Sequence, residues 1–352
     1  MEVPSLFGAC PAPRPETERV LLAHGSGGLL TSQLIEEMVL PAFRNPALEL
    51  LDDQAVLPFG AGGERIAFTT DSYVVTPLFF PGGDIGELAV NGTINDLAMG
   101  GARPVALSLA FILEEGLPFE ELRRVIESAR RAAAGAGVPI VTGDTKVVGR
   151  GNGDKIFINT SGIGLVPAGV HLSSSRVAPG DVILLSGAIG DHGATILAER
   201  EGLALGGALA SDTAALHELS AEILRAAPGT HAMRDPTRGG LATVLVEIAS
   251  RRKLGVDVDE RSVPVHDAVR GACELYGLDP LLLANEGKLV AFVPAAEADQ
   301  ALAAMRAHPL GCEAARIGYV TGDGAGLVTL RTPLGGRRIL DLPYAEPLPR
   351  IC

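Results

Sequence analysis

The chain has 352 residues, of which 47% are hydrophobic, and it carries a formal net charge of −13. A surface of that charge repels phosphate backbones, so we expect no nucleic-acid partner. We also expect no membrane association, because no apolar run reaches the roughly 18 residues of a spanning helix and the first residues lack the pattern of a signal peptide.

Alternating apolar and helical patterns predict an α/β protein with two halves. Residues 1–18 are rich in proline, and we expect them to form a disordered arm. The first half, 19–167, contains four predicted strands, at Ile66–Thr70, Val105–Leu113, Val138–Thr142 and Ile156–Val166. Asp84 is a candidate cap for a helix that runs to about Met99. Pro118 lies near the start of a second predicted helix, and Gly135 and Gly137 lie near its end.

A linker-like stretch from Pro167 to Pro179 separates the halves, and a new strand is expected from Asp181. We assign 168–340 to a second α/β domain. The last segment, 341–352, contains three prolines, which disfavour helix and sheet, so we expect a flexible extended tail. Fully extended, that tail would span roughly 40 Å, enough to reach from one site to another.

The four cysteines show no C-x-x-C spacing, which argues against a zinc knuckle or a disulfide framework and fits a reduced cytoplasm. Cys352 is the last residue. It is not a prenylation site, since that signal requires three residues after the cysteine. A thiol on a flexible tail could carry a substrate between pockets, and the alternative is an unselected tail residue.

A glycine-rich run precedes a helical pattern near the start of the chain, at His24, Gly25, Ser26, Gly27 and Gly28. Backbone N–H groups in such loops, together with a following helix N-terminus, suit phosphate. The alternative is a surface turn, because the chain contains 44 glycines.

Several aspartates lie where predicted elements end or in apolar surroundings, namely Asp52, Asp53, Asp71, Asp96 and Asp144. Asp96 shares an apolar helix with Asn91 and Asn95, and burying such groups is costly unless they are hydrogen-bonded or metal-bound. Carboxylates are ligands for magnesium, so the set predicts a metal and nucleotide site. The alternative for each residue is a turn or capping role.

Three further motifs could carry chemistry. Lys146 lies two positions after Asp144, on the same face if the segment is extended, where it could neutralise phosphate charge or simply pair with Asp144. Asp235 opens the segment DPTRGG before a helix, whose glycines could expose N–H groups to an anion and which Thr237 could cap. Glu286, in NEGK beside apolar residues, is a candidate general base, although Glu-Gly turns are common.

In matching order these motifs resemble the HypE family of hydrogenase maturation proteins. The similar segments are HGSGG, TTDSYVV, NGTINDLAMGG, GDTKVV, RDPTRGG, NEGK and the tail PRIC. The resemblance covers nearly the whole chain from about residue 20. Several motifs are shared with the wider superfamily of aminoimidazole ribonucleotide synthetase and selenophosphate synthetase, and the terminal cysteine is what separates HypE from them.

The resemblance implies an N-terminal domain whose strands form a shared β-barrel in a homodimer, followed by a C-terminal α/β domain. It also implies a reaction. The carbamoyltransferase HypF places a carbamoyl group on Cys352, and this chain uses ATP to dehydrate that group to a thiocyanate. The cyano group then passes to the HypC–HypD complex and becomes a ligand of the nickel–iron hydrogenase.

Under this interpretation Mg²⁺ is held by Asp53, Asp71, Asp96 and Asp144. Glu286 is the base and Lys146 assists it, while the glycine loop, Asn91 and Asp235 complete the ATP site. One alternative is a related selenophosphate or purine synthetase. The former needs a reactive cysteine followed by lysine, whereas Cys10 precedes Pro11 with no lysine nearby. Another is a non-catalytic nucleotide-binding scaffold that docks the maturation partners.

Overall fold

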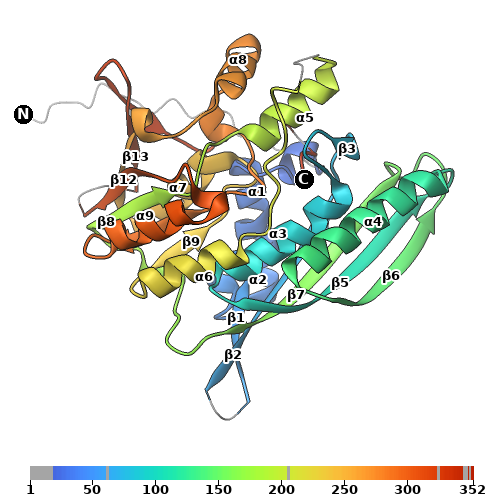
Figure 1. Ribbon diagram of the computed structural model, residues 1–352, viewed down its shortest axis with the longest axis horizontal. Coiled ribbons are helices and arrows are strands. Elements are labelled where there is room, and N and C mark those ends of the chain that lie inside the picture. The colour runs from blue at the N-terminus through green and yellow to red at the C-terminus, as the bar shows by residue number, and fades with distance from the viewer. Residues whose placement is uncertain (1–18, 61–62, 204–206, 323–325, 344–347, 349) are drawn as a thin grey trace, which may run out of the picture.

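The structure is a computed structural model that describes residues 19–60, 63–203, 207–322, 326–343, 348 and 350–352. Two large sheets carry the fold, each with helices against it (Figure 1). The first sheet has five strands, in the order β1 (Ala55–Phe59), β2 (Glu64–Tyr73), β7 (Ile156–Val166), β5 (Arg103–Glu114) and β6 (Ile140–Val148). A short hairpin pairs β3 (Phe79–Phe80) with β4 (Gly83–Asp84).

The strands of the first sheet are antiparallel except for β5 and β6, which are parallel. β7 has the predicted bounds, whereas β2 and β5 are longer than expected. β6 starts two residues later than predicted and continues to Val148. The expectation that Asp71 and Asp144 follow the ends of their strands is therefore wrong, because each lies inside a ladder, opposite Thr160 and Ala110 respectively.

Two helices cover one face of this sheet, α3 (Ile85–Met99) and α4 (Phe119–Ala136), as Figure 1 shows. Asp84 caps α3 as predicted, since its Oδ1 accepts hydrogen bonds from Gly86 N at 2.8 Å and Glu87 N at 3.1 Å. The opposite face of the sheet carries exposed apolar side chains, among them Leu57, Phe59, Phe68, Ile163 and Leu165. Within one chain this face is only partly shielded from solvent.

A glycine in the middle of α3 is explained by what lies against it. A Cβ built at Gly92 would lie 2.1 Å from the Tyr73 hydroxyl oxygen. That hydroxyl donates a 2.8 Å hydrogen bond to Asp71 Oδ2. Gly92 therefore leaves room beside α3 for the Tyr73 hydroxyl in the position where it bonds Asp71, its neighbour on β2.

The second sheet has seven strands, in the order β14 (Arg337–Leu340), β13 (Val328–Arg331), β10 (Gly255–Asp259), β12 (Ala315–Thr321), β8 (Asp181–Leu185), β11 (Val290–Pro294) and β9 (Ala232–Arg234). β8 is buried along its whole length because helices cover both faces. Val182 and Leu184 point towards α6 (His217–Ala226) and α9 (Ala298–Ala307), whereas Ile183 and Leu185 point towards α7 (Gly240–Arg252).

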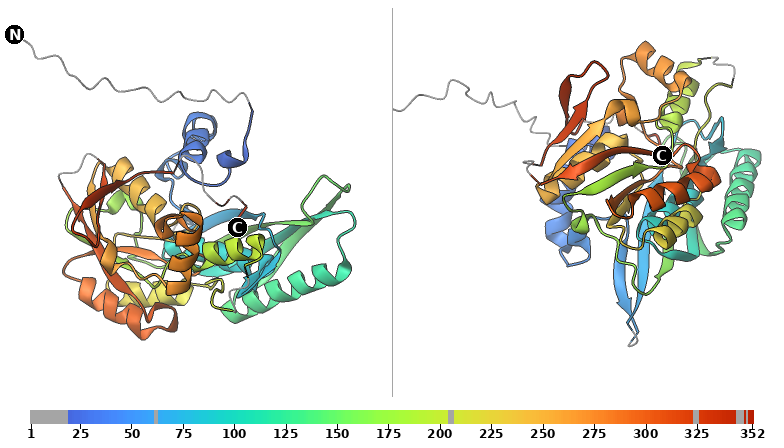
Figure 2. Two further views of the ribbon diagram at one scale, coloured as in Figure 1. Left: turned by 90° about the horizontal axis from the view of Figure 1, so that it is seen from above. Right: turned by 60° about the vertical axis from the view of Figure 1, so that its left-hand side comes forward.

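Two more helices, α5 (Asp191–Glu201) and α8 (Asp267–Tyr276), join the halves in one apolar cluster with α3 and the end of the chain. The described tail residues are seated there: Leu348 and Ile351 are buried. Cys352 O accepts from Val74 N at 3.1 Å and Arg350 O from Thr76 N at 3.4 Å, so two hydrogen bonds attach the end of the chain to the segment that follows β2. Arg350 has φ 59° and is therefore not in a strand conformation. Figure 2 shows the C-terminus between the two halves.

Some predictions lie outside the described residues. These include the arm at 1–18 and tail residues 344–347 and 349. The flexibility of the tail therefore stays a prediction. The division into domains at 167 and 340, both of which are described residues, also stays a prediction. In the described part of the chain, no helix combines the length and apolar character that crossing a bilayer requires.

We predict that Gly92→Ala lowers the free energy of unfolding by about 1–3 kcal/mol, because the new methyl group must displace Tyr73. Gly135→Ala is the matched control. Gly135 lies in α4, the helix beside α3, and a Cβ there would meet nothing within 4 Å. This change should therefore stabilise the protein by about 0.5–1 kcal/mol. Urea denaturation of both variants measures the difference, and equal effects would contradict the packing explanation for Gly92.

Candidate active site

A pocket of about 440 Å³ opens where the two halves meet, a size typical of small-molecule sites. Both sheets and the tail contribute to its walls. The predicted site residues that line it are Gly27, Gly28, Asp53, Asp71, Asp96, Asp235, Glu286 and Cys352. Residues more than 300 positions apart in sequence therefore meet at one cavity, as expected if the glycine loop, the carboxylates and the terminal thiol serve one reaction.

The glycine loop contributes only its last two residues to the pocket, so His24, Gly25 and Ser26 lie outside its lining. Gly27 N donates to Thr31 Oγ1 at 2.9 Å. Gly28 has φ 77°, and a Cβ there would lie 2.5 Å from the carbonyl oxygen of Pro343. The glycine is thus required where the loop meets the segment that leads to the tail. The phosphate-binding role of the loop stays a prediction.

Asp71 and Asp96 face the pocket from β2 and α3. Asp71 accepts from Tyr73, and Asp96 Oδ2 accepts from Thr69 Oγ1 at 2.6 Å. Burial raises the pKa of Asp96 well above its usual value, and the negative charge of Asp71 adds to that effect. The pair therefore favours a cation or a proton between the two carboxyl groups.

Asp53 lies deeper and pairs with Arg234, whose Nε is 2.7 Å from Asp53 Oδ1. The other carboxylate oxygen, Oδ2, is buried with no hydrogen-bond partner. Burial raises the pKa of Asp53, although the charge of Arg234 opposes the shift. Burial likewise raises the pKa of Asp235 to about 6, again against Arg234. The empty lone pairs of Asp53 make it a candidate ligand for a hard cation.

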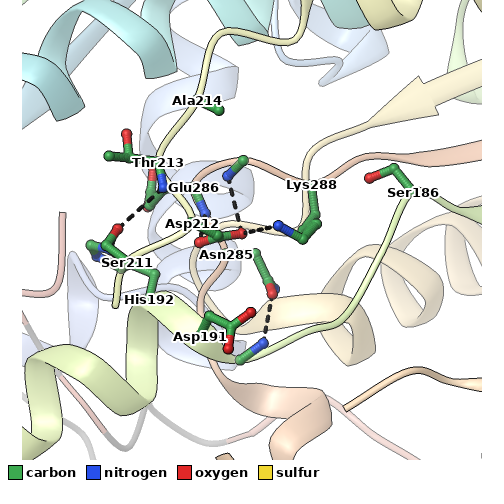
Figure 3. Close-up of polar contacts among 12 residues, drawn as sticks. Ser186, Asp191, His192, Ser211, Asp212, Thr213, Ala214, Asn285, Glu286 and Lys288 are labelled. Atoms are coloured by element: carbon green, nitrogen blue, oxygen red, sulfur yellow. Dashed lines mark hydrogen bonds and ion pairs between the residues drawn. The ribbon is translucent and has the colours of Figure 1, made fainter. Parts of the chain in front are cut away.

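Glu286 is 3% exposed, and its Oε1 has no hydrogen-bond partner. Burial raises the pKa of Glu286 well above its usual value, and the charge of Asp212 raises it further. Asp212 also fixes the turn, because its carboxylate accepts from Glu286 N at 3.0 Å, Gly287 N at 3.2 Å and Lys288 Nζ at 3.1 Å (Figure 3). A carboxyl group that is held rigidly and whose pKa is raised above its usual value is suited to exchange protons as a general base or acid.

Besides the first three residues of the glycine loop, three more predicted residues are not brought to the pocket within one chain. Asn91 is buried on the other side of α3, where its Nδ2 donates to Thr213 Oγ1 at 3.3 Å. Asp144 and Lys146 form an exposed ion pair, with Nζ 2.6 Å from Oδ2, on the edge strand β6. β7 and β5 separate that strand from β2. The roles of Asp144 as a metal ligand and Lys146 as a catalytic group stay predictions that a single chain does not support.

Other groups of the site escaped sequence reasoning. Tyr73, Arg234 and Arg238 line the pocket, and Asp212 and His192 support it. His192 stands in the run GDHG and Arg234 directly precedes the predicted Asp235, which are the signals that could have drawn attention to them. The expectation that Thr237 caps its helix is wrong, since the N-cap of α7 is Gly239 with φ 72°. Among the described residues, no three His, Cys, Asp or Glu side chains gather closely enough to hold a metal ion by themselves.

Comparison with known proteins gives the family. The family model of the N-terminal domain of AIR synthase related protein matches residues 51–166, and that of its C-terminal domain matches 178–331. The chain is 54% identical to the carbamoyl dehydratase HypE of Cupriavidus necator over 95% of each protein. The predicted resemblance and the two-domain α/β fold are confirmed.

Two solved structures are similar over almost their whole lengths. Hydrogenase maturation protein HypE in complex with ATP is 49% identical, with a TM-score of 0.80, covering 95% of this chain and 100% of that one. A HypE from a HypE–HypF complex is 46% identical, with a TM-score of 0.83, covering 88% and 99%.

We predict that Asp235→Asn raises the free energy of unfolding at pH 7 by about 1–3 kcal/mol, because the native protein no longer buries that charge. The native pKa lies above the unfolded one, so the wild-type protein binds more protons when folded and loses stability as pH rises from about 4 to about 6. The variant should lose less over that window.

Urea denaturation between pH 4 and 7, without nucleotide or metal, measures this effect. Asp299→Asn is the control, since that carboxylate is 91% exposed and its removal should change stability by less than about 0.5 kcal/mol at any pH. If the two variants showed the same pH profile, Asp235 would not be a strained buried acid.

Proposed function

The chain belongs to the HypE carbamoyl dehydratases, a family of AIR synthase related proteins, and from this premise we propose that it dehydrates a carbamoyl group carried on its own Cys352. ATP drives the reaction, and the product is a thiocyanate that supplies the cyanide ligand of a nickel–iron hydrogenase. One observation carries the proposal: Cys352 lines the same pocket as Glu286 and the aspartates. A purine or selenophosphate synthetase would have no use for a terminal thiol in that position.

The nucleotide site is the part of the pocket formed by the glycine loop, Asp71, Asp235 and Arg238. A close relative was solved with ATP bound, which supports the same ligand here. The Arg238 guanidinium offers donors in the fixed geometry that phosphate oxygens prefer. Gly27 and Gly28, both with positive φ, bring the backbone next to the space where the triphosphate would lie.

Magnesium fits the donors of this pocket. Asp53 Oδ2 is buried without a partner. Burial, and after it the negative charge of Asp71, raises the pKa of Asp96, so a cation beside Asp96 would be favoured. Since the described carboxylates do not gather closely enough to hold the ion by themselves, they would bind it partly through waters and phosphate oxygens, as magnesium prefers. When bound, the ion would neutralise phosphate charge. Asp144 is not available from the same chain.

The chemistry follows from the poor leaving ability of an amide oxygen. That oxygen attacks the γ-phosphorus and ADP leaves. The C–O bond then breaks, so the oxygen departs as phosphate while nitrogen loses both of its protons and a C≡N bond forms. The S-carbamoyl group of Cys352 and ATP thus give a thiocyanate on Cys352, ADP, phosphate and a proton. Glu286 takes the nitrogen protons, because its raised pKa makes its carboxylate a stronger base.

Water must be kept from the activated intermediate, and the seated tail serves this purpose. Ile351 is 1% exposed and Leu348 is also buried, so apolar side chains close the pocket behind the thiol. The Arg350 guanidinium pairs with Asp154 at the outer end. A closed, dry site strengthens each electrostatic contact with the reacting group.

Lys146 fits the reaction only through a second copy of the chain. It lies on the face of the five-stranded sheet that bears the exposed apolar side chains, the face expected to close a shared barrel in a homodimer. Pairing there would bury that apolar surface and bring Lys146 and Asp144 towards the partner. HypF would carbamoylate the undocked tail, as the complex of a relative with HypF supports. HypC–HypD would receive the cyano group, in the cytoplasm.

We predict that Cys352→Ala abolishes thiocyanate formation but leaves ATP affinity within about twofold, since the thiol carries the substrate and the nucleotide contacts lie elsewhere. Cys312→Ala, which removes an exposed cysteine, is the control and should retain full activity. Intact mass spectrometry with HypF, carbamoyl donor and ATP should show wild-type protein gaining one carbamoyl group and then losing one water. Gain without loss would make the chain a carrier or scaffold rather than a dehydratase.

We predict that Lys146→Ala and Glu286→Gln each abolish dehydration, whereas the two variants co-expressed recover about a quarter of wild-type activity, because half of the dimers are mixed and each has one intact site. Separately tagged copies allow the mixed dimer to be purified and assayed for thiocyanate. If the mixed dimer were as inactive as its parents, Lys146 would not act across the interface.

A further inference from the structure

We propose that His192 and Ser211 are positioning residues that seat the last peptide of the tail and so hold the Cys352 sulfur in the pocket. The part of this inference that concerns the reaction rests on the proposed function. The part that concerns docking does not, since it follows from contacts of the chain with itself.

His192 lies at the start of α5, fully buried, and contacts the tail directly. Its Nε2 is 2.9 Å from the carbonyl oxygen of Ile351, and its Nδ1 is 2.8 Å from Ser211 Oγ. A carbonyl can only accept, so Nε2 carries the proton and Nδ1 accepts from the Ser211 hydroxyl. Burial lowers the pKa of His192, which keeps the ring neutral, and the edge of the Phe80 ring contacts it at a centroid distance of 5.5 Å.

The hydrogen bonds of the docked tail explain why this contact is needed. The carbonyls of Arg350 and Cys352 accept from Thr76 N and Val74 N. Ile351, between them, is buried in the apolar cluster, and so is its carbonyl. A buried carbonyl without a donor is costly. In the described part of the chain, the Nε2 of His192 supplies a donor to this carbonyl.

Ser211 is also the first residue of a four-residue segment, Ser211–Ala214, whose members contact different parts of the site (Figure 3). Asp212 holds the Glu286 turn through two backbone N–H groups. Ala214 N donates to Glu286 O at 3.3 Å. A short series of contacts therefore runs from the tail to His192 and from His192 to Ser211. The next residue in the chain, Asp212, holds the backbone of Glu286. The same segment, Ser211–Ala214, therefore supports both the docked tail and the base Glu286.

The test measures how often the tail leaves its docked position, as the rate at which Cys352 becomes accessible to a labelling reagent. Full-length protein with a free thiol is labelled with a bulky maleimide that a pocket of about 440 Å³ does not admit. A protease that cuts before aspartate releases residues 341–352, and mass spectrometry gives the labelling rate of Cys352. Cys312, which is exposed in the same molecule, gives the internal reference rate.

His192→Ala should speed Cys352 labelling about three- to tenfold, the effect of losing one neutral hydrogen bond on the undocked fraction. His192→Gln should restore slow labelling, because its amide N–H can reach the Ile351 carbonyl. Ser211→Ala should give an intermediate rate, since the ring loses the donor that orients it. His217→Ala is the matched control: this half-buried histidine of α6 should leave the rate unchanged.

Unchanged Cys352 labelling in His192→Ala, or equal acceleration in His217→Ala, would overturn the docking role. The catalytic consequence is read separately, as the single-turnover rate of water loss from a carbamoylated tail at saturating ATP. His192→Ala should slow that step by about the factor by which it speeds labelling. A wild-type protein that shows no water loss would instead refute the proposed function, whatever the labelling result.

Discussion

The site depends on two backbone hydrogen bonds that hold the end of the tail against residues 74–76, the segment that follows β2. β2 carries Asp71 and Tyr73 towards the pocket, so whatever bonds residues 74–76 is held close to those groups. Cys352 bonds Val74 and Arg350 bonds Thr76. A shift by one residue would move Ile351 out of its apolar cluster. Hydrogen bonding and burial therefore select the same position for the thiol.

The pocket surrounds the thiol with buried carboxyl groups, and their negative charges destabilise one another because they lie close together. Burial raises the pKa of Asp53, Asp96, Asp235 and Glu286, and each is raised further by the charge of a neighbouring acid. Arg234 opposes the effect for two of them. Such a cavity is suited to a ligand that arrives with cations, and it retains protons where the reaction must remove and return them. The same charges explain why stability and function make opposite demands on these residues.

Local patterns predicted the elements better than the contacts between them. The cap at Asp84, the bounds of β7 and the position of Glu286 in a turn before a strand are signalled by neighbouring residues. Asp144 was expected at the end of a strand, but β6 continues through it, and the order in which the strands pair decides which face Asp144 and Lys146 share. His192 was missed because its partners, Ser211 and Ile351, are 19 and 159 positions away. No periodicity encodes contacts at that separation.

The central claim is that the carbamoyl oxygen leaves Cys352 by transfer to phosphorus inside this pocket. Labelling the carbamoyl oxygen with oxygen-18 tests it most directly. After one turnover with ATP, mass spectrometry should find the heavy oxygen in inorganic phosphate and a thiocyanate on the tail. Heavy oxygen recovered in water, with phosphate unlabelled, would show that ATP does not activate the group in this way and would contradict the account.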